Sequence, residues 1–555
     1  METIDKHKVK NKIKESNTLI KNKEYNQAIS LLVELLEEFP TAGLYAKLGE
    51  AYLSNSQLQK AYELLKEGLD RYPKNHKITK QLASLYMEKK EWKKASSYWR
   101  ITLKRNKEEE NSDNIYINLG KSLRLSEQFE DAEKILSEGI NLYPNNRKLR
   151  FEIAQLYMDL KDWKLALNYW EDLIETHGSH ASLSAKVNHT ITMQITGKKL
   201  NNDFLEENSL DIKIKYKNGY KKIILFDNGE SRIEFYKNLY KQSDTVCVTF
   251  DPWKHLWNKE PFAYQFLIKQ GIDIIAVRKR REDTFHQDLT IEEFQTTISS
   301  LCQTYRHQVV YGSSLGAYCA LYYGPVLNCQ ILAFSPRNPG HPVFGIPLKY
   351  KVDFKHDLTI NAHSHLSPII SYDPKDTVDN NYVEKELINA FPNATFLKCE
   401  YAGHTTIKYF LEIGELKSIV LSVLNGEELK VINRKNRSKS SEYLGTLGKE
   451  CLKRNKYNWA LSLSNRALEL ETKNKDAIIL KIDALKELDK TEQAASFTEE
   501  AIKVLPKNKK IRLSLIDLYI TLDNKEKAMQ EIEKAIEDFP DSTVFLLRKN
   551  TIQES

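Results

Sequence analysis

The 555-residue sequence lacks a long apolar run, which excludes one class of protein. No stretch approaches the ~18 consecutive apolar residues that a membrane-spanning helix requires. The first residues also lack the short apolar core of a secretory signal peptide. We therefore expect a cytoplasmic protein without a membrane span.

Metal-binding and nucleotide-binding motifs are missing as well. The six cysteines form no Cys-x-x-Cys pair, and the sequence contains neither His-Glu-x-x-His nor a glycine-rich loop that ends in lysine. The net charge is +7, and the 83 basic residues are interspersed with 76 acidic ones, which argues against nucleic-acid binding. The sequence thus implies no metal, no cofactor and no nucleic-acid partner.

A repeat with a period of ~34 residues occupies both ends of the chain. In five N-terminal units a small residue recurs at the same place: Ala28, Ala61, Ala95, Ala132 and Ala166. Three C-terminal units share it: Ala460, Ala494 and Ala528. Prolines such as Pro73 and Pro506 fall between units, where a helix must stop. This spacing predicts helical hairpins over residues 9–180 and 441–547, the second range including a capping helix.

The repeats resemble the tetratricopeptide repeat (TPR) family. That resemblance implies two α-solenoids, each with a concave groove that binds a protein partner. An intramolecular brace for the middle of the chain is the alternative, and the sequence leaves both open.

Two segments without the repeat flank a central region. Residues 181–215 combine a predicted helix at 182–196 with a polar linker at 201–209, and residues 426–440 form a second, basic linker. Between them, over 216–425, apolar runs alternate with helix-like segments. This alternation predicts an α/β domain with a mainly parallel sheet covered on both faces.

Seven short apolar runs in this region predict strands: Lys222–Phe226, Thr245–Phe250, Ile272–Val277, Gln308–Tyr311, Gln330–Phe334, Ile369–Tyr372 and Phe396–Glu400. Four segments between them predict helices: Arg232–Gln242, Pro261–Gln270, Thr290–Tyr305 and Glu384–Ala390. In such a sheet, ligands bind at the carboxyl ends of the strands.

The run Gly312-Ser313-Ser314-Leu315-Gly316 follows a predicted strand and precedes a helix-like segment. This pattern is typical of a nucleophile elbow, in which the turn is too tight for a side chain at either glycine. The glycine spacing selects Ser314 as the exposed nucleophile. His404 follows a later strand on a small-residue loop and is the candidate general base.

The order of serine, acid and histidine, each just past a strand, resembles the α/β-hydrolase superfamily over roughly residues 210–425. Three aspartates follow the strand at 369–372: Asp373, Asp376 and Asp379. The superfamily commonly places its acid in a tight turn a few residues past the strand, which favours Asp376, with Asp373 second. The resemblance implies a triad of Ser314, Asp376 and His404.

Such a triad also needs N–H donors for the developing oxyanion. The resemblance places one at the backbone of Leu315. The second comes from residues 227–229 or from residues 251–253, where Trp253 is the candidate, and the sequence does not choose between these loops. Three arginines follow strands and are candidates for binding an anionic substrate: Arg278, Arg281 and Arg337. A solvated basic turn is the alternative explanation for them.

Together these features predict a serine esterase, acyl hydrolase or acyltransferase that repeats place on protein partners. Its substrate would be a small ester or an acylated glycan. The combination of repeats with a hydrolase-like domain is analogous to proteins of bacterial cell-surface polysaccharide modification. The alternative is a scaffold in which the hydrolase-like domain is a binding platform without turnover.

Overall fold

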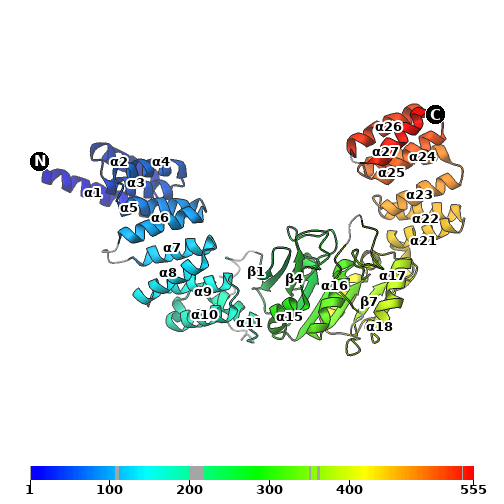
Figure 1. Ribbon diagram of the computed structural model, residues 1–555, viewed down its shortest axis with the longest axis horizontal. Coiled ribbons are helices and arrows are strands. Elements are labelled where there is room, and N and C mark those ends of the chain that lie inside the picture. Colours follow the sequence, from blue (N-terminus) through cyan, green and yellow to red (C-terminus); the bar gives the residue numbers. More distant parts are fainter. Residues whose placement is uncertain are drawn as a thin grey trace. The chain divides into compact units, whose positions relative to one another are not determined.

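The computed structural model describes residues 2–106, 112–198, 215, 218–348, 352–358, 363–540 and 542–554. The chain forms two compact units, residues 1–200 and residues 201–555. The first, drawn from blue to cyan in Figure 1, is helical, and the second combines a sheet with further helices.

The first unit is a stack of helical hairpins with a final helix. The helices are α1 (Glu2–Lys21), α2 (Tyr25–Glu38), α3 (Ala42–Ser54), α4 (Leu58–Arg71), α5 (His76–Glu88), α6 (Trp92–Arg105), α7 (Asp113–Leu125), α8 (Phe129–Leu142), α9 (Arg147–Asp159), α10 (Trp163–His177), the short η1 (Gly178–His180) and α11 (Leu183–Ile195). Ser182 caps α11, which confirms the helix predicted at 182–196. The predicted linker at 201–209 lies outside the described residues.

Small residues determine how the hairpins pack. The recurring alanines are fully buried: Ala28, Ala61, Ala95, Ala132 and Ala166. At Gly120 a Cβ would lie 2.4 Å from Cδ2 of Leu136, so the paired helices approach so closely that the leucine would have to shift to admit a side chain there. Each hairpin turns through one residue with positive φ: Lys23, Ser56, Lys90, Glu127 and Lys161. The solenoid geometry predicted from the spacing is confirmed.

The second unit is built on an eight-stranded mixed sheet. The strands are β1 (Tyr220–Asp227), β2 (Ser231–Asn238), β3 (Thr245–Phe250), β4 (Asp273–Lys279), β5 (His307–Ser313), β6 (Gln330–Phe334), β7 (Ile369–Tyr372) and β8 (Thr395–Lys398), in the order β1-β2-β4-β3-β5-β6-β7-β8. Only β2 runs against the others, since it pairs antiparallel with both β1 and β4. The prediction of a mainly parallel sheet is therefore confirmed.

The predicted helix at Arg232–Gln242 is wrong, because this segment forms β2. A hairpin turn makes it a strand: Gly229 has φ +88°, and its N–H donates to Asp227 Oδ1 over 2.9 Å. Asn228 Oδ1 accepts the N–H of Ser231 over 2.7 Å. Residues 227–229 therefore join two antiparallel strands and do not lead into a helix.

Helices connect and cover the strands. They are α14 (Tyr264–Lys269), α15 (Ile291–Cys302), α16 (Leu315–Tyr323), η2 (Gly324–Leu327), α17 (Thr377–Tyr382), the π-helical η3 (Val383–Leu387), α18 (Ile388–Ala390), α19 (Thr406–Glu412) and α20 (Leu416–Leu424). At the start of α15, Thr290 and Glu293 form a capping box.

A second helical array follows the sheet domain within the same unit. It comprises η4 (Arg434–Lys439), α21 (Ser441–Lys453), α22 (Tyr457–Leu470), α23 (Lys475–Glu487), α24 (Thr491–Val504), α25 (Lys509–Thr521), α26 (Lys525–Asp538) and α27 (Thr543–Glu554). Its recurring alanines are also fully buried: Ala460, Ala494 and Ala528. Tyr443 and Leu444 of α21 belong to one apolar core with Tyr409 and Phe410 of α19. The array and the sheet domain therefore share a core.

Candidate active site

Ser314 occupies a strained turn between β5 and α16. Its backbone has φ 53° and ψ −119°, a conformation that a residue with a side chain rarely adopts. A Cβ at Gly312 would lie 2.1 Å from the carbonyl oxygen of Gly316, and one at Gly316 would lie 2.5 Å from that of Phe250. Both glycines are therefore sterically required, and the nucleophile-elbow geometry predicted from the motif is present.

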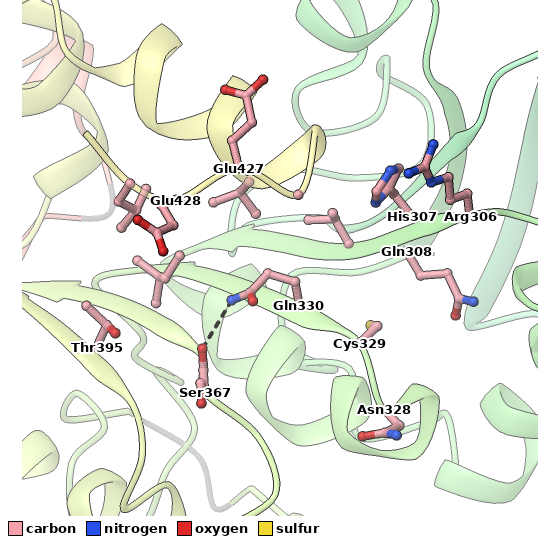
Figure 2. Close-up of a pocket in the computed structure, with 15 residues that line it drawn as sticks. Arg306, His307, Gln308, Asn328, Cys329, Gln330, Ser367, Thr395, Glu427 and Glu428 are labelled. Carbon is pink, nitrogen blue, oxygen red and sulfur yellow. Dashed lines mark hydrogen bonds between the residues drawn. The ribbon is translucent and has the colours of Figure 1, made fainter.

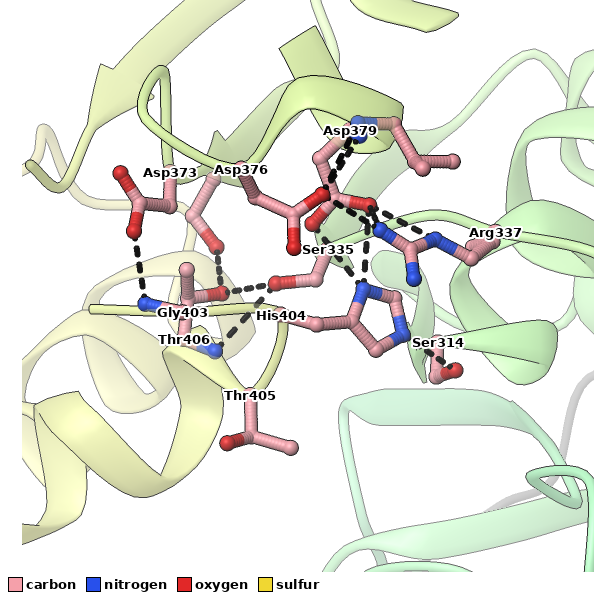
Figure 3. Close-up of polar contacts among 12 residues, drawn as sticks. Ser314, Ser335, Arg337, Asp373, Asp376, Asp379, Gly403, His404, Thr405 and Thr406 are labelled. Atoms are coloured by element: carbon pink, nitrogen blue, oxygen red, sulfur yellow. Dashed lines mark hydrogen bonds and ion pairs between the residues drawn. The ribbon is translucent and has the colours of Figure 1, made fainter. Parts of the chain in front are cut away.

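Figure 3 shows that His404 lies between Ser314 and an aspartate. Its Nε2 is 2.9 Å from Ser314 Oγ, and its Nδ1 is 3.0 Å from both carboxylate oxygens of Asp379. The Asp379 side chain is 2% exposed, whereas that of His404 is 24% exposed. A buried carboxylate thus orients an imidazole whose other nitrogen reaches the serine hydroxyl at the surface.

The carboxylate next to the imidazole belongs to Asp379, so the choice of Asp376 is corrected. Asp376 is the N-cap of α17, and its Oδ1 accepts the N–H groups of Val378 and Asp379 over 3.1 and 2.9 Å. Asp379 lies in the first turn of that helix, so the helix directs its side chain at His404.

Asp373, the second choice, shapes the loop that carries the base. Its carboxylate accepts backbone N–H groups from Lys375, Tyr401 and Gly403 over 2.8, 3.0 and 2.7 Å. Burial raises the pKa of Asp373, and the three backbone hydrogen bonds oppose that rise. Two of these three hydrogen bonds hold residues just before His404.

Threonine and serine hydroxyls hold the other side of the same loop. Thr406 Oγ1 lies 2.7 Å from Ser335 Oγ and 2.7 Å from Ser371 Oγ. Ser335 follows β6, and Ser371 belongs to β7. Residues on both sides of His404 are therefore tied to the carboxyl ends of the sheet (Figure 3).

The three candidate substrate arginines occupy different environments. Arg337 lies beside the site, but its guanidinium pairs with Asp376 over 2.7 Å and Asp379 over 2.5 Å. The side chain of Arg278 is 1% exposed and pairs with Asp251 and Glu234, so its placement at a pocket mouth is corrected. Arg281 is 58% exposed beside Glu230 and Asp283, on a solvated turn.

Two backbone N–H groups, one on the elbow and one on the loop after β3, have no acceptor among the described residues. Leu315 is the first residue of α16, and the first N–H groups of a helix have no acceptor within it. The N–H of Trp253 donates to no group in the described part of the chain. Because Gly316 touches the carbonyl of Phe250, the loop that follows β3 lies beside the elbow, while residues 227–229 are a hairpin turn.

A separate hollow lies at the amino ends of the parallel strands, opposite the carboxyl ends that carry Ser314 and His404 (Figure 2). Its lining includes the first residues of β5, β6 and β7. Its volume is about 580 Å³, and Arg306, His307, Cys329 and Glu427 are among its lining residues. Burial raises the pKa of the Cys329 thiol to about 12, so this thiol is a poor nucleophile at neutral pH. The hollow contains no counterpart of the Ser314 arrangement.

Neither a membrane helix nor a metal cluster is found among the described residues. No helix there is both long and apolar enough to cross a bilayer. No group of three or more histidine, cysteine or carboxylate side chains there is arranged to hold a metal ion.

Comparison with known proteins identifies the repeats. Sequence profiles for the tetratricopeptide repeat match residues 13–76 and 487–549. No curated protein matches the chain.

Several solved repeat structures are similar to part of the chain. PilF of Pseudomonas aeruginosa is 16% identical, with 38% of this chain and 92% of that chain covered and a TM-score of 0.33. A tetratricopeptide repeat protein of Parabacteroides merdae is 18% identical, with 37% and 79% covered and a TM-score of 0.31. MamA of Desulfovibrio magneticus is 18% identical, with 32% and 98% covered and a TM-score of 0.29.

Proposed function

We propose that the sheet domain is an α/β-hydrolase-type serine hydrolase or acyltransferase, which the repeats attach to protein partners. The observation that carries this proposal is the continuous line of contacts from Ser314 through His404 to the buried Asp379. The mainly parallel sheet, with only β2 reversed, and the strained elbow at the end of β5 support the same fold.

The geometry suits nucleophilic acyl transfer. His404 Nε2 takes the proton of Ser314 Oγ as the hydroxyl attacks an ester carbonyl, and it later returns that proton to the leaving alcohol. Asp379 accepts the Nδ1–H of the imidazole and stabilises the imidazolium that forms. The N–H groups of Leu315 and Trp253 donate to the carbonyl oxygen as it gains negative charge. Water or another hydroxyl then releases the acyl group.

The arrangement favours a small, neutral ester or an acetylated glycan over an anionic substrate. Arg337 is the only one of the three candidate arginines that lies beside the triad, and two carboxylates already neutralise its charge. An acidic substrate would have to compete with Asp376 and Asp379 for this guanidinium. We therefore propose short acyl esters and acetylated sugars as the first substrates to assay.

A non-catalytic scaffold is the second candidate function. The matches to tetratricopeptide repeat profiles at both ends favour it, because such solenoids present concave surfaces to protein partners. The two functions are compatible, since a partner held by a repeat groove could carry the ester. They differ in whether Ser314 reacts.

Covalent labelling by a fluorophosphonate tests this difference. We expect the native protein to be labelled at one serine and the Ser314→Ala variant to be unlabelled. The matched control is Ser313→Ala, which removes the neighbouring hydroxyl and should keep the label. Labelling that persists in Ser314→Ala would exclude Ser314 as the nucleophile. A folded native protein that is not labelled would leave the scaffold as the function.

A second pair of variants tests the acid. Replacing Asp379 by Asn keeps the shape but favours the wrong imidazole tautomer, and we expect turnover of an aryl acetate to fall roughly 10⁴-fold. Replacing Asp376 by Asn changes a cap that an asparagine can also provide, so its effect should be far smaller. A larger loss from Asp376→Asn than from Asp379→Asn would contradict this assignment.

A further inference from the structure

Lys279 is the last residue of β4. It is a buried lysine that forms no ion pair with a carboxylate among the described residues. The residue is fully buried, and its ammonium donates to the carbonyl oxygens of Trp253 and His255, the latter over 2.6 Å. Among the described residues no ion pair is formed by this side chain. A buried ammonium is costly unless it is well compensated. The fold nevertheless places this charge against the carbonyl groups of the loop that follows β3.

Its neighbour Arg278 holds the same loop from the adjacent position. Arg278 Nη2 donates to the carbonyl oxygens of Leu256 and Lys259 over 3.0 and 2.8 Å, and its Nε donates to Asp251 over 2.6 Å. Two consecutive cations at the end of β4 thus bind four carbonyl groups of one loop. The loop is held by charge-assisted hydrogen bonds, which are stronger than neutral ones.

The remaining carbonyls at the start of this loop are also held. His286 Nε2 donates to Asp251 O over 3.1 Å, and the N–H of His255 donates to Pro252 O over 3.1 Å. The N–H groups of Trp253 and Lys254 donate to nothing in the described part of the chain. In a planar trans peptide the N–H and C=O point in opposite directions. Because Lys279 binds the carbonyl of Trp253, the N–H of Lys254, which shares that peptide, points away from Lys279. The N–H of Trp253 lies opposite the carbonyl of Pro252, which the N–H of His255 holds.

We propose that Lys279 is a positioning residue for acyl transfer at Ser314, orienting the loop of residues 252–255 so that its N–H groups face the developing oxyanion. This inference rests on the proposed hydrolase function. The elbow lies against the start of this loop, because Gly316 touches the carbonyl oxygen of Phe250. The buried charge also polarises the peptide groups that it binds, which strengthens their N–H donors.

The charge of Lys279 is sensitive to pH near neutrality. Burial lowers the pKa of Lys279 to about 8. The charged or titratable groups that influence it come from the preceding residue, the loop after β3, the turns after β4 and the elbow helix: Arg278, Asp251, Glu282, His286 and Cys319. Asp251, Cys319 and Glu282 favour the ammonium, while Arg278 disfavours it. Above pH ~8 the loop therefore loses the cation that holds its carbonyls.

The test compares Lys279→Met with Lys237→Met in the full-length protein. Lys237 is also fully buried, but it pairs over 2.7 Å with Asp273, the residue at the opposite, amino end of β4. We expect Lys279→Met to slow fluorophosphonate labelling at least about tenfold, approaching the roughly 10²–10³-fold cost of removing an oxyanion donor. Lys237→Met should lower the melting temperature and leave the labelling rate constant of the folded protein unchanged. Lys279→Arg should restore part of the rate.

The ester kinetics provide a readout that a purely structural role would not move. Lys279→Met should lower kcat for an aryl acetate with little change in KM, because the oxyanion forms only after binding. Folded Lys279→Met that is labelled at the native rate would overturn the positioning role alone. Absence of Ser314-dependent labelling in the native protein would overturn the hydrolase proposal, and this role with it.

If Lys279→Met does not fold, the native protein still decides the question. Its labelling rate should fall reversibly as the pH rises through about 8, where Lys279 loses its proton. A labelling rate that stays constant well above that pH would overturn the proposal.

Discussion

The two repeat arrays are built alike but are attached differently. In both, fully buried alanines and close-packed glycines bring paired helices together. The N-terminal array forms a compact unit of its own, residues 1–200. The C-terminal array shares an apolar core with the sheet domain, in which Tyr443 of α21 and Phe410 of α19 both take part. The same repeat can therefore serve as a separate module or as a structural part of a neighbouring domain.

The shared interface lies next to the candidate base. Glu442 of α21 accepts a hydrogen bond from Thr405 Oγ1 over 3.3 Å and pairs with Lys408 over 2.5 Å. Thr446, also on α21, would lie 3.2 Å from a Cβ at Gly403. Residues on both sides of His404 thus contact the first helix of the C-terminal array. We therefore expect changes in the array to alter the proposed reaction at Ser314.

Removing one array or the other should give the largest difference between the two. Removing residues 440–555 exposes the apolar side chains of Tyr409, Phe410 and Ile413, each worth about 1.5–3 kcal/mol when buried. We expect the remaining protein to aggregate or to lose its cooperative thermal transition, together with fluorophosphonate labelling. Removing residues 1–200 should preserve both properties. Equal effects of the two truncations, measured by circular dichroism and labelling, would show that the attachment does not differ.

Acid should destabilise the second unit through buried histidines. Burial lowers the pKa of His286 to about 4 and that of His356 to about 3. Both remain neutral in the folded state, while the unfolded chain binds protons below pH ~6.5. The stabilisation is complete above pH ~6.5 and is lost as the pH falls towards 4, by several kcal/mol in total.

Urea unfolding at pH 7 and at pH 4.5 measures this loss. We expect the second unit to unfold at a lower urea concentration than the first at pH 4.5, which would separate two unfolding transitions. A single transition at both pH values would contradict the idea that the two units unfold independently. His356→Gln is the control, because it removes one titrating group and should reduce the loss.

Adding a methyl group inside each array gives a smaller effect. A Cβ at Gly120 would lie 2.4 Å from Leu136 Cδ2, and one at Gly448 would lie 2.4 Å from Leu480 Cδ2. Overpacking costs about 1–3 kcal/mol, which the better helix propensity of alanine reduces by about 1 kcal/mol. We expect Gly120→Ala and Gly448→Ala to destabilise their own units similarly in urea. Only Gly448→Ala should slow labelling, and an equal slowing by Gly120→Ala would contradict the proposed attachment.

Removing an ion pair should produce the smallest difference in stability between the two arrays. Lys408 binds Glu442 and Glu471 over 2.5 and 2.7 Å at the shared interface, where it is 34% exposed. Replacing Lys408 by Met should cost about 1 kcal/mol, because this partial exposure to water limits the value of the pairs. Replacing Lys94, which pairs with Glu91 on the exposed surface of the N-terminal array, should leave the melting temperature unchanged. A larger shift from Lys94→Met would reverse this order.

Local patterns were sufficient where one short segment determines the geometry. The strands at 245–250, 330–334 and 369–372 have the predicted bounds, and the glycine spacing correctly identified Ser314 as the strained residue. At 232–242 the sequence prediction of a helix was wrong, although Asp227-Asn228-Gly229 is a strong hairpin signal. That signal could have revealed β2.

The acid and the arginines show where local patterns fail. Asp373, Asp376 and Asp379 all follow one strand, and only the direction of α17 decides that Asp379 meets His404. Arg278 and Arg281 are close in the sequence, yet one is buried in an ion-pair network and the other is exposed on a turn. Spacing along the chain does not specify these directions.

The sequence by itself determined the repeats and the alternation of strands and helices. It also identified Ser314 and His404 separately, because each of these features depends on a local pattern of neighbouring residues. Only the tertiary structure decided which carboxylate orients the imidazole, that Lys279 holds the loop beside the elbow, and that one repeat array shares the core of the sheet domain. These features arise where segments distant in sequence pack against each other, and side-chain directions there depend on the whole fold.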